Sequence, residues 1–169
     1  MAVSIAIESP LQNEVRQLVA ELNGHLIPLS PLEFQFKMTV EQMAGVDTTV
    51  FVARNEAGAA VGIGALKVIS AGEGEVKRMY TSPSVRGQRV GSALLEAIER
   101  LARQKGISLL LLETGTGDGM TGAHRLYTRS GFTARGPFSD YPDSEWSAFF
   151  EKRIAAPAVV QVATITTDL

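Results

Sequence analysis

The 169-residue sequence contains no cysteine, which excludes disulfide bonds and thiolate metal sites. It has two histidines, His25 and His124, whose wide separation argues against a zinc site, so we expect no metal. No apolar run approaches the ~20 residues that span a bilayer, and residues 1–8 lack the basic segment and apolar core of a secretory signal. The net charge of −2 gives no general attraction to nucleic acid or to anionic membranes. These absences predict a cytoplasmic protein that binds neither nucleic acid nor membrane.

Apolar periodicity and turn residues predict a single domain over residues 1–153 in which strands and helices alternate. Residues 25–45 predict one or two short helices, with a capping box at Ser30–Glu33, and are a candidate lid on the substrate side. Residues 154–169 are expected either to add a strand or to be disordered. The other expected elements, in chain order, are a strand at 3–7, a helix from Ser9 and Pro10 to Gly24, strands at 48–54, 60–69 and 75–81, a helix from Val90 to Gly106, a strand at 108–112, a helix at 123–130, and strands at 132–135 and 147–152.

The connection between the strands at 75–81 and 108–112 is helical, which implies that these two strands run parallel. The strands at 48–54, 60–69 and 75–81 are joined by short turns, as in an antiparallel meander. The sequence therefore predicts a mixed α/β (α+β) fold, with a mainly antiparallel sheet of six to seven strands and about four helices.

The most informative segment is the turn Arg86–Ser92, which lies between a strand and a strongly amphipathic helix. A helix N-terminus offers unpaired N–H groups and a partial positive charge, and two arginines here add fixed cations. The segment lacks both the lysine of a nucleotide P-loop and the three-glycine spacing of a dinucleotide site. It is either a pyrophosphate site or a basic loop with ordinary turn glycines.

This segment resembles the coenzyme A motif of the GNAT superfamily of N-acetyltransferases, Gln/Arg-x-x-Gly-x-Gly/Ala. Arg86 fills the first position and Gly91 the last, while Arg89 stands where the middle glycine is usual. Because arginine resists positive φ, the sequence leaves the backbone shape of the loop open. The resemblance extends over about residues 3–153 and includes the Met79–Pro83 strand end and the Ala123-x-x-Leu126-Tyr127-x-x-x-Gly131-Phe132 pattern.

The resemblance implies an N-acetyltransferase that uses acetyl-coenzyme A as co-substrate, with a central parallel strand pair that splays apart to admit the pantetheine arm. It implies an acceptor amine on a small molecule, amino acid or peptide, direct attack in a ternary complex, and, because such proteins are often dimers, a homodimer. Met120 stands where the family often has asparagine, which leaves the course of the 115–122 loop open. The implied coenzyme-binding residues are Met79, Tyr80, Thr81, Arg86, Gly87, Gln88, Arg89, Val90, Gly91 and Ser92.

Three side chains are candidates for proton transfer. In the resembling family a tyrosine at the position of Tyr127 donates a proton to the departing thiolate; the alternative is a core aromatic. Glu75 is the leading general base, because members of the resembling family place a glutamate on this strand and alternation puts Glu75, Lys77 and Met79 on one face. The alternative is an exposed strand carboxylate paired with Lys77 or Arg78. Glu113, at the carboxyl end of a buried strand, is the competing base. A water chain could also carry the proton, and His124 is more typical of a solvated surface.

The acceptor side has two candidate walls. Phe34, Phe36 and Met38 either cap an acceptor pocket or belong to the core, and the core is the stronger interpretation. The acidic and aromatic run at 140–146 either attracts a cationic amine or forms a solvated loop. Besides an enzyme, the sequence leaves open a non-catalytic coenzyme A sensor, and an interaction protein that uses the apolar residues at 159–166.

Overall fold

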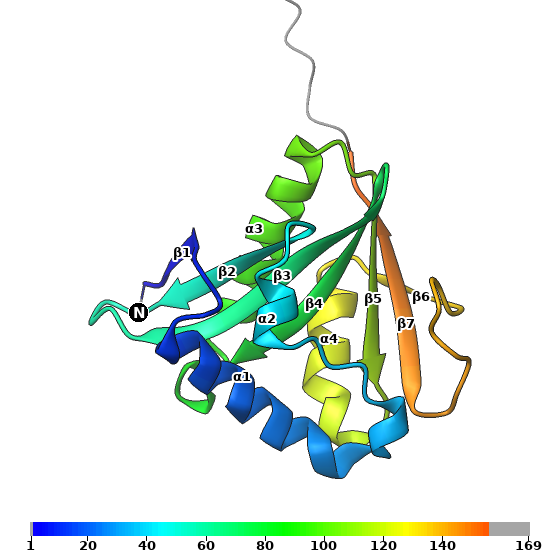
Figure 1. Ribbon diagram of the computed structural model, residues 1–169, viewed down its shortest axis with the longest axis horizontal. Coiled ribbons are helices and arrows are strands. Elements are labelled where there is room, and N and C mark those ends of the chain that lie inside the picture. Colours follow the sequence, from blue (N-terminus) through cyan, green and yellow to red (C-terminus); the bar gives the residue numbers. More distant parts are fainter. Residues whose placement is uncertain (1, 156–169) are drawn as a thin grey trace, which may run out of the picture.

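The computed structural model describes residues 2–155, so the strand or disorder expected after 155 lies outside the described residues. Seven strands form one sheet in the order β1-β2-β3-β4-β5-β7-β6 (Figure 1). The mixed fold and the central parallel pair predicted from the sequence are confirmed. The strands are β1 (Ser4–Ile7), β2 (Thr48–Arg54), β3 (Ala60–Ser70), β4 (Glu73–Thr81), β5 (Leu109–Gly115), β6 (Thr133–Arg135) and β7 (Ser147–Arg153).

The parallel pair β4 and β5 divides the sheet, while all other neighbouring strands run antiparallel. Its register runs from Glu73 opposite Leu109 to Glu75 opposite Leu111. Beyond these residues the two strands diverge, and the sheet opens into a V (Figure 1). The carboxyl-terminal halves of β4 and β5 therefore face each other across a gap, with backbone groups that no sheet neighbour occupies on that side.

Four α-helices and four single 3₁₀ turns complete the described part of the chain, and none of these helices is both long and apolar enough to cross a membrane. One sheet face is covered by α3, which contacts β2, β3 and β4; α1 contacts β3 and β4 from the other face. The helical elements are α1 (Asn13–Leu26), η1 (Ile27–Leu29), η2 (Leu32–Phe34), α2 (Val40–Met43), η3 (Pro83–Val85), α3 (Val90–Gln104), η4 (Asp118–Met120) and α4 (Thr121–Arg129).

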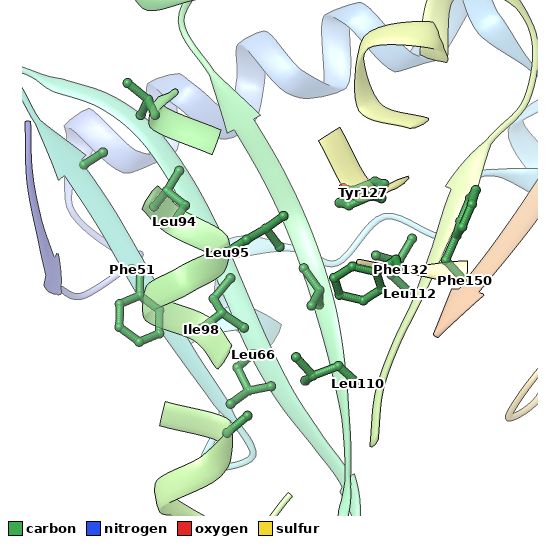
Figure 2. Close-up of a cluster of buried hydrophobic side chains, with 14 of the residues drawn as sticks. Phe51, Leu66, Leu94, Leu95, Ile98, Leu110, Leu112, Tyr127, Phe132 and Phe150 are labelled. Carbon is green, nitrogen blue, oxygen red and sulfur yellow. The ribbon is translucent and has the colours of Figure 1, made fainter. Parts of the chain in front are cut away.

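The largest core cluster joins α3 to the sheet and continues to α4 (Figure 2). The apolar stripe of α3 supplies Leu94 and Ile98, both with no exposed surface, against Leu66 of β3 and Leu110 of β5. Tyr127 of α4 lies at the other end of the same cluster. Because a buried cluster of this kind packs at crystal-like density, it holds α3 and α4 in fixed positions on either side of the β4–β5 gap.

The start of the first helix differs from the prediction. Ser9 does not cap it: Ser9 Oγ accepts a hydrogen bond from the Leu11 N–H at 3.2 Å and closes a turn, and α1 begins only at Asn13. Gly24, predicted as the end, lies inside α1 because the helix continues to Leu26. The predicted capping box at 30–33 is also wrong; the box is formed by Thr39 and Gln42 at α2.

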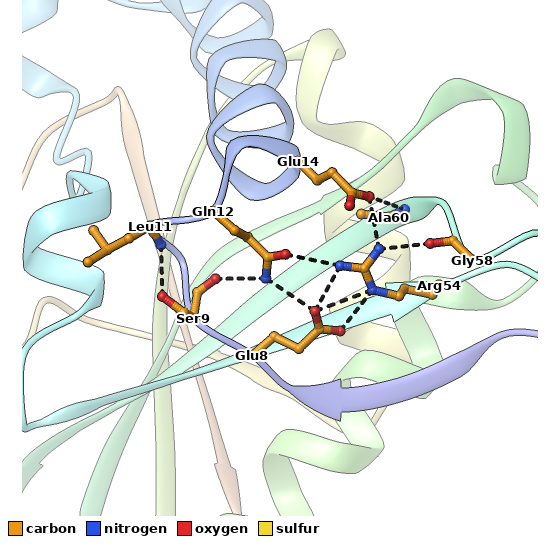
Figure 3. A network of polar contacts seen from close by, with 8 residues as sticks. All are labelled: Glu8, Ser9, Leu11, Gln12, Glu14, Arg54, Gly58 and Ala60. Atoms are coloured by element: carbon orange, nitrogen blue, oxygen red, sulfur yellow. Dashed lines mark hydrogen bonds and ion pairs between the residues drawn. The ribbon is translucent and has the colours of Figure 1, made fainter.

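A guanidinium group anchors this first helix (Figure 3). Arg54 at the end of β2 donates to both carboxylate oxygens of Glu8, to Gln12 Oε1, to Glu14 Oε2 at 2.8 Å and to the Gly58 carbonyl oxygen at 2.8 Å. The Arg54 hydrogen bonds to Glu8, with smaller contributions from the Gln12 side chain and from the charge of Arg54, hold the pKa of Glu8 below its ordinary value. The network fixes the beginning of α1, and therefore the position of the residues at its far end.

Candidate active site

The loop between β4 and α3 contains two residues with the positive φ angles that are typical of glycine, although only one of them is a glycine. Gly87 has φ +80°, and Arg89 adopts a left-handed conformation with φ 62° and ψ 25°. A non-glycine residue in this region costs about 1–2 kcal/mol. The backbone shape that the sequence left open is therefore left-handed at Arg89, in spite of the strain. The exposed side chain of Arg89 places a cation at the N-terminus of α3.

The N-terminus of α3 has the features that suit an anion-binding site. No side chain caps it, and its first turn contains no acidic residue. The helix also approaches α4 closely, because a Cβ on Gly91 would lie 2.9 Å from Leu126 Cδ2. The exposed side chains of Arg86 and Arg89 flank these uncapped N–H groups. Amide donors, helix dipole and two guanidinium groups together suit a diphosphate.

A cleft of about 580 Å³ runs from this loop to α4. Of the ten coenzyme-binding residues expected from the sequence, nine line it, and Gln88 does not. Gln88 Nε2 donates instead to the Ser84 carbonyl oxygen at 3.4 Å. Arg125 and Arg129 of α4 also line the cleft, which sequence reasoning missed. Their spacing of four residues, on one face of a short helix that carries Tyr127, was the available signal.

A smaller pocket of about 130 Å³, the inner pocket, lies on the other side of Tyr127 from the cleft. Its walls come from α1, the 29–37 segment, β4, β5 and Trp146. The pocket and the cleft share the residues at their junction, which are Leu22, Leu26, Met79, Met120, Ala123 and Tyr127. A molecule in the cleft and a second molecule in the pocket would therefore meet beside Tyr127.

A bulge in β4 corrects one prediction. Arg78 has φ +55°, and the β3–β4 register shifts between Ile63 and Ala65. Glu75 and Lys77 share a face as expected, but Met79 packs against the core cluster of the opposite, α3 face. The extra residue at the bulge reverses the alternation, so the prediction that Met79 shares the face of Glu75 is wrong.

Tyr127 is buried, with 7% of its surface exposed, and its ring packs edge-on against Phe132 at 5.9 Å between centroids. Burial, and after it the charge of Glu113, raises the pKa of this phenol above its ordinary value of 10.0. The group is therefore protonated at neutral pH. It belongs to the core, as one interpretation of the sequence held, and it also lines both cavities.

Glu75 is paired with Lys77, as one interpretation of the sequence held, but it is buried, with 4% of its surface exposed, rather than exposed. Its Oε2 accepts hydrogen bonds from Tyr141 Oη at 2.6 Å and from Lys77 Nζ at 3.3 Å, and Lys77 also donates to Tyr141 Oη at 2.8 Å. Burial and the Glu75 carboxylate raise the pKa of Tyr141. Sequence reasoning placed Tyr141 in an acidic wall and missed its bond to Glu75.

Glu113 reaches the same pocket from β5, and neither Lys nor Arg forms an ion pair with it in residues 2–155. Ser147 Oγ of β7 donates to its Oε1 at 2.9 Å. Burial raises the pKa of Glu113, and the Ser147 hydrogen bond only partly offsets this. Both predicted carboxylates thus lie in one pocket with Tyr127.

The remaining candidates divide between site and surface. Phe34 and Phe36 line the pocket, whereas Met38 is in the core. His124 is half-buried rather than fully solvated: its Nε2 donates to the Gly115 carbonyl oxygen at 2.8 Å, and its ring packs on Phe150. The acidic side chains at 140, 143 and 145 are exposed and do not line the pocket. In the 2–155 range, no cluster of three or more His, Asp or Glu side chains is placed to hold a metal ion.

Met120 fills the position where asparagine is usual. Its side chain is buried against Gly115, where a Cβ would lie 3.3 Å from Met120 Cγ. The loop after β5 is therefore closed by an apolar contact, and Met120 lines both cavities at their junction.

Comparison with known proteins agrees with this geometry. The acetyltransferase (GNAT) domain family matches residues 46–134. An IAA acetyltransferase from Azospirillum brasilense is 44% identical over 151 residues, which are 89% of this chain and 97% of that protein. A Klebsiella pneumoniae crystal structure, assigned as an acyl-CoA N-acyltransferase, superposes with a TM-score of 0.74 at 33% identity and covers 89% of this chain and 97% of its own.

A third match shares the fold. The PaiA N-acetyltransferase of Thermoplasma acidophilum, solved with coenzyme A, has a TM-score of 0.71 at 18% identity, over 91% of this chain and 100% of its own. The family match, the close relative and the cradle at the start of α3 agree with one another. The chain therefore belongs to the GNAT superfamily and is an N-acetyltransferase that uses an acyl-coenzyme A donor.

Proposed function

We propose that the protein transfers the acetyl group of acetyl-coenzyme A directly to an amine held in the inner pocket. One observation carries this proposal: the coenzyme-sized cleft and the small pocket meet at Tyr127. Two substrates bound at once would place their reacting atoms at that junction. The absence of cysteine removes a thioester acyl-enzyme and favours direct transfer.

On the donor side, Arg86, Arg89 and the uncapped start of α3 hold the diphosphate. The gap between the diverging halves of β4 and β5 accepts the extended arm, whose polar groups can pair with the free strand edges. Arg125 and Arg129 supply further cations at the outer rim of the cleft. The coenzyme supplies an activated thioester, and the protein positions it.

On the acceptor side, Glu113 receives the proton of the ammonium group. Its raised pKa makes it a stronger base than an ordinary carboxylate; the charge of Lys77 offsets the rise only in part, and Glu113 forms no ion pair in residues 2–155. Glu75 is the second candidate, but its Oε2 already accepts bonds from Tyr141 and Lys77. Tyr127 donates its proton to the departing sulfur, since burial keeps the phenol protonated.

The test is turnover with a defined acceptor. The full chain is incubated with acetyl-coenzyme A and a panel of amines, amino acids and peptide N-termini, and thiol release is followed above the rate without acceptor. Mass spectrometry then identifies the acetylated amine. Acceptor-dependent release lost in Glu113→Gln and kept in Glu151→Gln, a carboxylate on β7 outside both cavities, supports the assignment. Tight coenzyme binding with no acceptor-dependent release would refute it.

A further inference from the structure

The inner pocket contains a buried cation without an anionic partner. Arg78 has 8% of its surface exposed, and burial lowers the pKa of its guanidinium to about 10, so it is charged at neutral pH. Its Nη2 donates to Asn23 Oδ1 of α1, and its Nε has no hydrogen-bond partner. None of the ion pairs in residues 2–155 includes Arg78. A buried charge without a partner is unfavourable unless a ligand supplies one.

A second orphaned group lies in the same pocket. Gln35 Nε2 donates to three carbonyl oxygens, those of Leu26, Ile27 and Ser30, which fixes the orientation of the amide. Its Oε1 is buried without a partner. In residues 2–155, Gln35 Oε1 and Arg78 Nε are the only buried side-chain polar atoms left unpaired, and both residues line the inner pocket. The unsatisfied polarity of the described core is thus concentrated at one site.

The other charges of the pocket do not neutralise Arg78. Five charged side chains line it: Lys37, Glu75, Lys77, Arg78 and Glu113. Glu75 is paired with Lys77 at 3.3 Å, and Lys37 is half-exposed to solvent. That leaves one buried cation, Arg78 from the bulge of β4, and one largely buried acid, Glu113 from β5. A ligand with an amine and an anionic group would complement both.

We propose that the acceptor is an amino acid-like compound whose carboxylate is bound by Arg78 while its amine faces Glu113 and Tyr127. This inference rests on the proposed function, because it names the acceptor of that same site. Arg78 lines the inner pocket and not the coenzyme cleft, so a diphosphate is not its ligand. A guanidinium group offers a planar pair of donors that matches a carboxylate, and a buried setting strengthens that pairing.

The test compares matched acceptors that differ only in the carboxylate. Phenylalanine is paired with 2-phenylethylamine, and methionine with 3-(methylthio)propylamine, and each kcat/KM is measured with saturating acetyl-coenzyme A. Wild-type protein should prefer the amino acids by roughly 10- to 100-fold. In Arg78→Gln the preference should fall to about one while the simple amines keep rates within a few-fold. Arg100→Gln, an exposed arginine on α3, is the matched control and should leave the preference unchanged.

If Arg78→Gln does not fold, a second variant tests the same inference. Asn23→Asp places a carboxylate where Arg78 already donates, which supplies the missing anion from within the protein. The variant should remain folded and lose preference for the amino acids. An equal fall in kcat/KM for both members of each pair, in either variant, would show that Arg78 serves only structure and would overturn the inference.

Equilibrium binding separates this inference from the proposed function. Calorimetry with coenzyme A present measures the affinity for each member of the pairs, without any need for turnover. Binding of the amino acids, but not of the decarboxylated amines, supports the carboxylate site even if no acceptor is acetylated. Equal affinity for both members, or no binding of the amino acids, overturns it even if simple amines are acetylated.

Discussion

Removal of the Tyr127 hydroxyl group gives the sharpest test of the proposal that Tyr127 is the general acid. Tyr127→Phe deletes only the hydroxyl group and keeps the ring that packs against Phe132 and Phe150. The ring lies in the largest core cluster, where truncation to alanine would cost several kcal/mol through the cavity it leaves. Phenylalanine avoids that cavity, so the variant isolates the chemistry from the packing.

The expected loss follows from the role. A positioned general acid contributes about 10²–10⁴-fold, which corresponds to about 2.7–5.4 kcal/mol of transition-state stabilisation. Within residues 2–155 the Tyr127 hydroxyl makes no hydrogen bond, and it is not an enclosed atom because Tyr127 lines both cavities. Its removal should therefore change the free energy of unfolding by less than about 1 kcal/mol. Coenzyme affinity should stay within a few-fold, since the proposed diphosphate site lies at the other end of the cleft.

The assay measures thiol release under single-turnover conditions, where chemistry limits the rate, and calorimetry measures the dissociation constant for coenzyme A. The pKa of Tyr127 is raised above 10.0, and a tyrosine donates only while protonated. The wild-type rate should therefore show no alkaline loss attributable to this residue below pH 10. Tyr141→Phe is the matched control, because it removes a hydroxyl that donates to Glu75 of the inner pocket, while Tyr141 itself lies outside the junction.

The Tyr141→Phe control should lose stability and have a smaller loss of rate than Tyr127→Phe. Tyr141→Phe leaves Glu75 without its 2.6 Å hydrogen bond, so it should destabilise the fold by about 1–3 kcal/mol and lower the rate less than Tyr127→Phe. A single-turnover rate of Tyr127→Phe within about threefold of wild type would refute the acid assignment. An equal fall in both variants would show that the pocket, rather than the proton donor, is being perturbed.

Three further predictions concern the cradle and the Arg54 network. Arg86→Ala should weaken coenzyme A binding about tenfold at low salt in calorimetry, and the deficit should shrink as salt screens the exposed charge; a deficit independent of salt would argue against phosphate contact. Arg89→Gly should raise thermal stability by up to about 1 kcal/mol by relieving the left-handed backbone, and weaken coenzyme binding by removing a cation; lower stability would contradict the strain. Glu8→Gln should cost about 1 kcal/mol in chemical denaturation at pH 7, and this deficit should disappear as the pH falls below 4.5, because a lowered pKa stabilises the fold only while Glu8 is ionised; a deficit constant from pH 7 to pH 3 would contradict the linkage.

The geometry of the loop and helix start at Arg86–Ser92 could be predicted from the sequence because its determinants are contiguous. Seven successive residues, Arg86–Ser92, contain the cations, the glycines and the start of an amphipathic helix. The helical crossover alone required a parallel pair, and the structure confirms it. Local spacing was enough here, since a helix N-terminus brings its own donors wherever the chain forms it.

The acceptor side could not be predicted in the same way, because its contacts join distant parts of the chain. Tyr141 and Glu75 are separated by 66 residues, and Arg54 and Glu8 by 46. The helix start at Ser9 was wrong because a serine hydroxyl can close a turn as readily as cap a helix, and the Arg54 contacts to Glu8 and Gln12 decide which. Such choices depend on tertiary packing, which outweighs local propensity.

The bulge at Arg78 places two side chains at once: Met79 packs in the core on the α3 face, and Arg78 lines the inner pocket. With regular alternation, Arg78 would face α3, whose buried stripe offers it no polar partner, and Met79 would share the sheet face of Glu75 and Lys77. The bulge exchanges these faces. Met79 packs beside Gly64, where a Cβ would lie only 2.5 Å from Met79 Sδ, so the glycine makes room for it. Arg78 then stands in the inner pocket with its charge unpaired, and the carboxylate binding proposed for it would account for the left-handed backbone that puts it there.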